Sequence, residues 1–168
     1  MPLTLYQASI PVFIRGFNNL PAVLDKAKAH AAANNIDLSL YVNARLAHDM
    51  YPLSGQVQGA SDAAKFGAAR LAAITPPSFA DTETTFDELQ ARIAKTLDFL
   101  KTVNEAQING RAGGQVTLKI RGKEMNFDCE PYLLNFVLPN FFFHLTTAYD
   151  ILRNQGVPLG KMDYLGSF

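Results

Sequence analysis

The stretch LTLYQASIPVFIRGFNNLPAVLDKAKAHA, residues 3–31, decides the fold. Its apolar residues recur every three or four positions for about four heptads, which is the spacing of one helix face. The phase continues through Pro11 and Pro21, whereas a loop between two helices usually breaks it. We therefore predict one long helix over residues 4–33, or two nearly collinear pieces, kinked at the prolines. Thr4 and Gln7 would form a capping box at its start.

Two further helical signals follow, separated by a proline. Asp37 is a capping residue for a helix over 38–50, which Pro52 ends because the residue before a proline avoids the helical region. Ser54 caps a second run over 55–74. Its expected buried face consists almost wholly of small residues, so a neighbouring helix can approach closely: Val57, Ala60 or Ser61, Ala64, Ala68 and Leu71.

A loop over 75–84 leads to the remaining helical segments. Thr85 and Glu88 form a capping box, and apolar residues at helical spacing continue behind it over 86–105. The last helix is predicted over 131–154, with a kink at Pro139. Its core stripe has one undecided position: Leu133, Val137, Asn140 or Phe141, His144, Ala148, Ile151 and Leu152.

Residues 115–128 change from helical spacing to the alternation of a strand. A two-residue turn at Gly122-Lys123 would align three cross-strand pairs: Ile120 with Met125, Leu118 with Phe127, and Arg121 with Glu124. Because an isolated hairpin is only marginally stable, we expect its apolar face to lie on the helices.

Together these segments predict an all-α fold, an antiparallel four-helix bundle with a β-hairpin inserted between the third and fourth helices. A length of 168 residues suits one domain over 1–168, with a tail over 157–168 that covers the bundle. No segment approaches the roughly 18 apolar residues of a membrane span, and none has the flanks of a signal peptide. We therefore expect a cytoplasmic protein that does not bind membranes.

Composition excludes several classes of function. Lys and Arg total 15, as do Asp and Glu, so the formal charge is zero and nucleic acid is not an expected partner. A single cysteine, Cys129, excludes an internal disulfide framework and a thiolate-rich zinc site. This cysteine near a helix start has either a thiol of lowered pKa or the character of an ordinary free cysteine.

His144 is the main candidate for chemistry because it interrupts an apolar, aromatic helix on the predicted core face. Asn140 lies one turn before it on the same face. Ligand and metal sites in bundles are built in the interior from facing helices, which favours a pocket here. The alternative is a core histidine whose ring nitrogens bond to neighbouring polar groups.

The segment before Pro52 carries a second group, Arg45, His48 and Asp49, placed to reach the mouth of the bundle. Asp49 could orient His144 or accept from Arg45 four residues earlier. The alternative is a surface group near a helix end. Tyr6, on the stripe of the first helix, completes the pocket candidates. The candidate ligands for a divalent metal are His144, His48 and Asp49, although no paired-histidine motif is present.

The aromatic run Phe141-Phe142-Phe143 wraps around the last helix, so at least one ring must point away from the core. An exposed aromatic patch of this kind favours a homodimer.

Six stretches carry a resemblance to a known family: NARLAHDMYPL at 43–53, QVQ at 56–58, ARLA at 69–72, LPNFFFH at 138–144, YDILR at 149–153 and GVPLGKMDYLG at 156–166. They resemble a bacterial family of unknown function within the DinB/YfiT-like four-helix-bundle superfamily. The resemblance implies an up-down bundle. The superfamily includes metalloenzymes and thiol-dependent transferases whose site has one histidine on the second helix and two, four residues apart, on the last. Here His144 matches the first of that pair, Ala148 stands in the place of the second, and His48 lies in the region of the second-helix ligand.

Two functional hypotheses follow. In the first, a polar pocket around His144, Asn140, Asp49 and Arg45 binds a small molecule; in an enzyme His144 would be a metal ligand or a general base. In the second, the chain is a non-catalytic, dimeric binding or structural module in which these polar residues satisfy one another.

Overall fold

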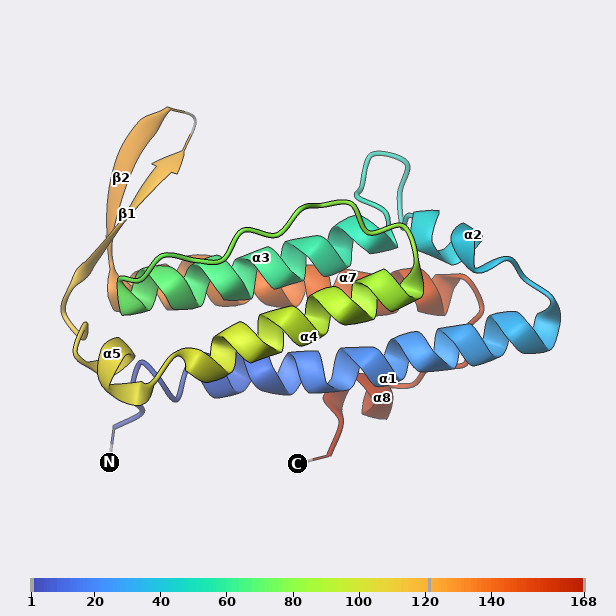
Figure 1. The fold of residues 1–168 in the computed structure, drawn as a ribbon, viewed down its shortest axis with the longest axis horizontal. Coiled ribbons are helices and arrows are strands. Elements are labelled where there is room, and N and C mark those ends of the chain that lie inside the picture. Colours follow the sequence, from blue (N-terminus) through green and yellow to red (C-terminus); the bar gives the residue numbers. More distant parts are fainter. Residues whose placement is uncertain (1, 121, 168) are drawn as a thin grey trace.

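The computed structural model describes residues 2–120 and 122–167 and is predominantly helical, with one small antiparallel sheet (Figure 1). The long helices are α1 (Ile10–Asn34), α3 (Leu53–Ala72), α4 (Phe86–Thr102) and α7 (Leu138–Asn154). The short helices are α2 (Leu38–Asn43), α5 (Glu105–Asn109), α6 (Cys129–Tyr132) and α8 (Lys161–Leu165). The strands are β1 (Gln115–Ile120) and β2 (Lys123–Asp128), and a π-helical turn over Leu133–Val137 joins α6 to α7.

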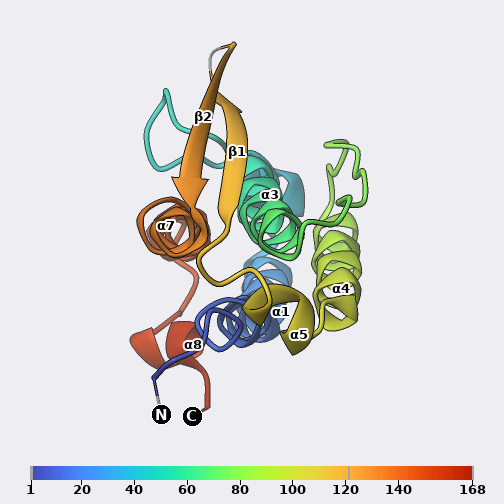
Figure 2. The ribbon, with the colours of Figure 1, turned by 90° about the vertical axis from the view of Figure 1, so that its left-hand side faces the viewer.

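The four long helices lie side by side, as the end-on view shows (Figure 2). α3 packs against both α4 and α7, and α1 packs against the same two helices. α3 and α7 run antiparallel, because Gly59 faces His144 and Gly67 faces Val137. The small-residue face predicted for the second main helix is buried and permits this close approach of α3 to α7. In the part of the chain that the structure describes, no helix has the length and apolar composition needed to cross a membrane.

The first helix begins later than predicted, at Ile10 rather than at residue 4. Thr4 and Gln7 make the expected reciprocal hydrogen bonds, at 3.1 and 3.2 Å, but these close a separate turn before α1. The physical reason is Pro11: a helix that starts at Ile10 places this proline in its first turn, where the missing N–H breaks no hydrogen bond and the ring meets no carbonyl of a preceding turn. Pro21 does lie inside α1.

The second predicted segment is also shorter. Asp37 caps α2 as expected, accepting from the Ser39 backbone N–H at 2.8 Å, but α2 ends at Asn43. Residues 44–52 form an irregular loop, which the Leu53 N–H closes by donating to the Ala44 carbonyl at 2.9 Å. α3 starts directly after Pro52, without a side-chain cap from Ser54.

The β-hairpin is confirmed, with its pairing shifted by two residues. Leu118 lies opposite Met125 and Val116 opposite Phe127, and the last described pair before the turn is Ile120 with Lys123. A shift of two preserves which side chains share a face. The predicted pair of Arg121 with Glu124 falls on a residue outside the described ones, and Glu124 pairs with Lys119 instead. Val116 and Leu118 are buried, whereas the hairpin tip extends away from the helices (Figure 2).

The last helical segment is continuous from Cys129 to Asn154. The π-helical turn ends just before Pro139, where the wider turn accommodates a residue that cannot donate a backbone hydrogen bond. The undecided stripe position is taken by Phe141, which is fully buried with Leu145. Asn140 and His144 are half-buried at the edge of the core rather than inside it.

The tail packs on the helical body. Val157 and Leu159 are buried, and α8 lies along α1, where Lys26 and Asp163 form an ion pair at 2.6 Å.

Candidate functional site

A cleft of 270 Å³ opens between α3 and the last helical segment. The α3 wall uses positions three or four residues apart, which share one helix face: Gly59, Asp62, Ala63, Phe66 and Arg70. The opposite wall comprises Tyr132, Phe136, Val137, Asn140 and His144. A second cleft of 240 Å³ adjoins the first and shares His144; its other lining residues are Asp49, Met50, Tyr51, Gln56 and Phe143.

His144 is held by a hydrogen bond that determines its tautomer. Its Nδ1 lies 2.8 Å from Gln56 Oε1, and the Nε2 of the same amide donates to the Tyr51 carbonyl at 3.0 Å. The Tyr51 carbonyl can only accept, so the amide oxygen must face the histidine, and Nδ1 must carry the proton. Nε2 therefore keeps its lone pair, and it bonds to no residue among 2–120 and 122–167.

Two further features define the state and position of this ring. Burial lowers the pKa of His144 below its ordinary value, so the imidazole is neutral near pH 7. Gly59 lies directly against the ring: a Cβ at this position would lie 2.7 Å from the imidazole Nε2. Only glycine leaves room for the ring in this place, so α3 and α7 position His144 together.

The other end of the cleft carries a cation. The Arg70 guanidinium donates to the Tyr132 hydroxyl at 3.2 Å and lies over the Phe66 ring, 5.1 Å from its centre. Burial raises the pKa of Tyr132, so its hydroxyl keeps its proton. Among the described residues, no ion pair within 4.0 Å involves the Arg70 guanidinium.

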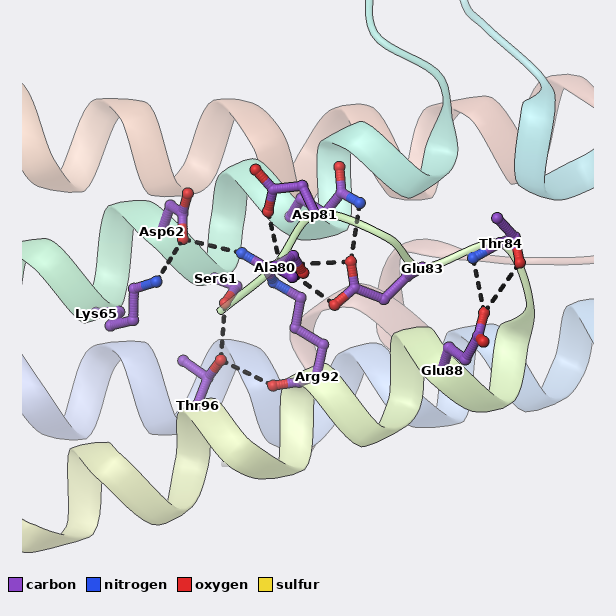
Figure 3. Close-up of polar contacts among 11 residues, drawn as sticks. Ser61, Asp62, Lys65, Ala80, Asp81, Glu83, Thr84, Glu88, Arg92 and Thr96 are labelled. Atoms are coloured by element: carbon purple, nitrogen blue, oxygen red, sulfur yellow. Dashed lines mark hydrogen bonds and ion pairs between the residues drawn. The ribbon is translucent and has the colours of Figure 1, made fainter. Parts of the chain in front are cut away.

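Asp62 joins the cleft to a network of ion pairs (Figure 3). Arg92 of α4, whose side chain is only 1% exposed, contacts Asp62 at 2.9 Å, Asp81 at 2.7 Å and Glu83 at 3.2 Å. Lys65 also contacts Asp62 at 2.9 Å. The network fastens the loop over 75–84 to α3 and α4, and it neutralises the carboxylate that faces the cleft.

The structure brings together only part of the predicted pocket. His144 and Asn140 line the same cleft, and Asp49 lines the adjoining one. Asp49 does not orient His144, because Gln56 holds that position. Arg45 donates to the Met50 carbonyl rather than to Asp49, because the loop over 44–52 is not helical and the four-residue spacing no longer places the two together.

The remaining candidates lie elsewhere. His48 is exposed on the same irregular loop and lines neither cleft. Tyr6 lies in the turn before α1, where its backbone N–H donates to Asn109 Oδ1 at 3.0 Å, and it lines neither cleft. Sequence reasoning missed Gln56, Arg70 and Tyr132. The signal for Arg70 was its spacing of four from Phe66 and eight from Asp62 on one helix face.

The three-histidine metal site implied by the superfamily resemblance does not fit these residues. Ala148 is fully buried and has no ligating atom, and the amide of Gln56 occupies Nδ1 of His144. Within the described ranges, 2–120 and 122–167, no three His, Cys, Asp or Glu side chains are grouped so that they could hold a metal ion. Burial raises the pKa of Cys129, so it is an ordinary buried cysteine rather than an activated thiol.

The structure is that of a predominantly helical protein with a cleft between α3 and the last helical segment. The chain belongs to the DUF1993 family, a domain of unknown function, whose family model matches residues 5–165. It is similar to the crystal structure of a DinB family member protein from Shewanella denitrificans, with a TM-score of 0.91 and 40% sequence identity. That similarity covers 98% of this chain and 93% of the other, and it confirms the DinB-like resemblance of the sequence motifs. No curated protein matches the chain.

Proposed function

We propose that the chain binds a small molecule in the cleft between α3 and the last helical segment, with the four long helices acting as an antiparallel four-helix bundle around it. The observation that carries this proposal is the Tyr51–Gln56–His144 chain of hydrogen bonds, which leaves the Nε2 lone pair available at the cleft wall. An acceptor fixed in this way, with no protein donor among the described residues, suits a ligand that donates to it.

The rest of the cleft has the composition of a ligand site. Phe66 and Phe136 supply apolar surface, and Asn140 and Arg70 supply polar groups. Small-molecule pockets commonly measure about 300–1,000 Å³, so a cleft of 270 Å³ suits a ligand of small volume.

Base catalysis is a second candidate function for the same residue. A general base must be unprotonated at the working pH and within reach of the bound molecule. The neutral His144 with its free Nε2 meets the first requirement without a metal ion.

A dimeric binding module remains the alternative. Several large apolar side chains of the last helical segment are exposed: Leu134 at 55%, Phe143 at 54% and Phe142 at 38%. We propose that a second copy covers this face, and light scattering of the purified chain tests it. A monomer at every concentration measured would refute the dimer and leave the cleft proposal unchanged.

The cleft proposal is tested by an NMR fragment screen with two matched variants. In His144→Asn, the side-chain amide nitrogen stands where Nδ1 stood, so the bond to Gln56 is kept and the Nε2 acceptor is lost. In His144→Gln, a longer amide can place an acceptor near the Nε2 position while the bond to Gln56 is lost. Thermal unfolding checks that both variants fold.

We expect fragments that shift the resonances of Asn140 and Gly59 in the wild type to bind His144→Asn about tenfold more weakly, which is the loss of one hydrogen bond. His144→Gln should retain more of the affinity. The proposal is wrong if no fragment shifts cleft resonances, or if fragments bind the wild type and His144→Asn equally well.

A further inference from the structure

Arg70 is a cation prepared for an anionic group. Its guanidinium is held by the Tyr132 hydroxyl and by the face of Phe66, so little conformational entropy remains to be lost on binding. It lines the cleft, and none of the described carboxylates neutralises it. Only Nη1 is occupied by Tyr132, which leaves the other donors of the planar fork for a ligand.

Tyr132 adds a second donor at the same place. Its oxygen accepts from Arg70, and its proton has no acceptor among the described residues. A guanidinium and a hydroxyl that lie next to each other on the cleft wall can together contact the two oxygens of a carboxylate.

The opposite end of the cleft has the reverse polarity. His144 presents the unpaired Nε2 acceptor, and Asp62 presents a carboxylate whose charge is balanced by Lys65 and Arg92. Asp62 and Arg70 are eight residues apart on α3, which corresponds to about 12 Å along the helix axis. Between the two ends the walls are apolar, with Phe66 and Phe136.

We propose that the ligand of this cleft is an elongated carboxylic acid, with its carboxylate on Arg70 and Tyr132, an apolar middle along Phe66 and Phe136, and a hydroxyl or other hydrogen-bond donor on His144. This inference rests on the proposed function, because it names the class of small molecule that the cleft takes. Arg70 and His144 thereby bind opposite ends of one ligand.

Three matched probes test this inference in NMR titrations of the whole chain: ω-hydroxyoctanoate, its neutral amide ω-hydroxyoctanamide, and octanoate, which lacks the donor. We expect ω-hydroxyoctanoate to bind most tightly and each of the others to bind about tenfold more weakly. In Arg70→Gln the acid should lose its advantage over the amide, while the amide itself binds as before. Lys101→Gln, which removes an exposed charge on α4, is the control and should leave all three affinities unchanged.

The outcomes separate this inference from the cleft proposal. Equal binding of acid and amide, or an acid preference that survives in Arg70→Gln, overturns the carboxylate assignment while cleft binding stands. The carboxylate assignment is also overturned if none of the three probes binds while neutral fragments from the screen still shift the resonances of Asn140 and Gly59. If inorganic phosphate binds the wild type as tightly as ω-hydroxyoctanoate does, and binds His144→Asn equally well, the cleft binds a simple anion and the proposal of an elongated acid is wrong.

Discussion

Replacing Arg92 by methionine should lower the free energy of unfolding by about 3 kcal/mol. Arg92 is the shared cation of three carboxylates, on Asp62, Asp81 and Glu83, and its side chain is almost fully buried (Figure 3). Methionine keeps an apolar stem of similar length but removes the guanidinium. The carboxylates therefore lose their common partner, and the loop over 75–84 loses its main attachment to α4.

The magnitude follows from how exposed each partner is. Removing one member of a buried ion pair costs about 3–5 kcal/mol, because the other charge is stranded. The lower end applies here, since Asp81 is 58% exposed and Asp62, at 34%, retains Lys65. Glu83, only 12% exposed, carries most of the penalty. For a chain of this length, about 3 kcal/mol corresponds to a decrease in Tm of about 6–12 °C.

Urea and thermal unfolding followed by circular dichroism measure this change. Lys101→Met is the control, because the ion pair of Lys101 with Asp98 is exposed on both sides and should contribute about 0–1 kcal/mol. If Arg92→Met unfolds within about 1 kcal/mol of the wild type with an unchanged m-value, the network does not stabilise the fold and the reasoning is refuted.

Three other predictions concern the residues around the cleft. Burial holds the pKa of His144 below 6.5, so as the pH falls the unfolded chain binds this proton before the folded chain does. The free energy of unfolding should therefore decrease below about pH 6.5. Urea titrations across this pH range should show a smaller decrease for His144→Asn. Gly67→Ala brings a Cβ against Val137 and should lower the free energy of unfolding by about 1–3 kcal/mol, as measured by thermal unfolding. Adding Val137→Ala should restore much of that loss. If the effects of the two substitutions on the free energy of unfolding simply add, the contact between these positions is contradicted. Cys129 should react with a thiol reagent only as fast as the chain unfolds, and rapid labelling of the native protein would show that it is accessible.

The helical segments and the hairpin were predictable because their signals are local. The capping box of Thr85 and Glu88 forms as predicted, with the Glu88 backbone N–H donating to Thr85 Oγ1 at 3.2 Å. The small-residue face of α3 is buried as its spacing indicated. These features depend on residues within a few turns of each other, where one helix geometry applies.

Boundaries and registers were less predictable because several local solutions have similar energies. Thr4 and Gln7 form the same hydrogen bonds in a separate turn as they would at a helix start, and Pro11 selects the later start of α1. In the hairpin, a shift of two residues keeps every side chain on its face, so the alternation alone could not choose the turn.

The candidate site depended on the tertiary structure for most of its members. Sequence patterns selected His144 and Asn140 because a polar residue inside an apolar helix is conspicuous, and the structure places both in one cleft. Gln56 lies 88 positions from His144 in the chain, and Arg70 lies 62 positions from Tyr132. No local pattern relates such residues, since only the packing of α3 on the last helical segment, α6 to α7, brings them together.

Periodicity and capping were therefore sufficient to predict where the main helical segments lie but not where each begins and ends, that a hairpin lies between 115 and 128, and that His144 is unusual. The folded chain decided what His144 bonds to, which of its nitrogens is free, and that Arg70 shares its cleft. The physical reason is that backbone geometry repeats along the sequence, whereas side-chain partners are selected by how helices distant in the sequence pack against each other.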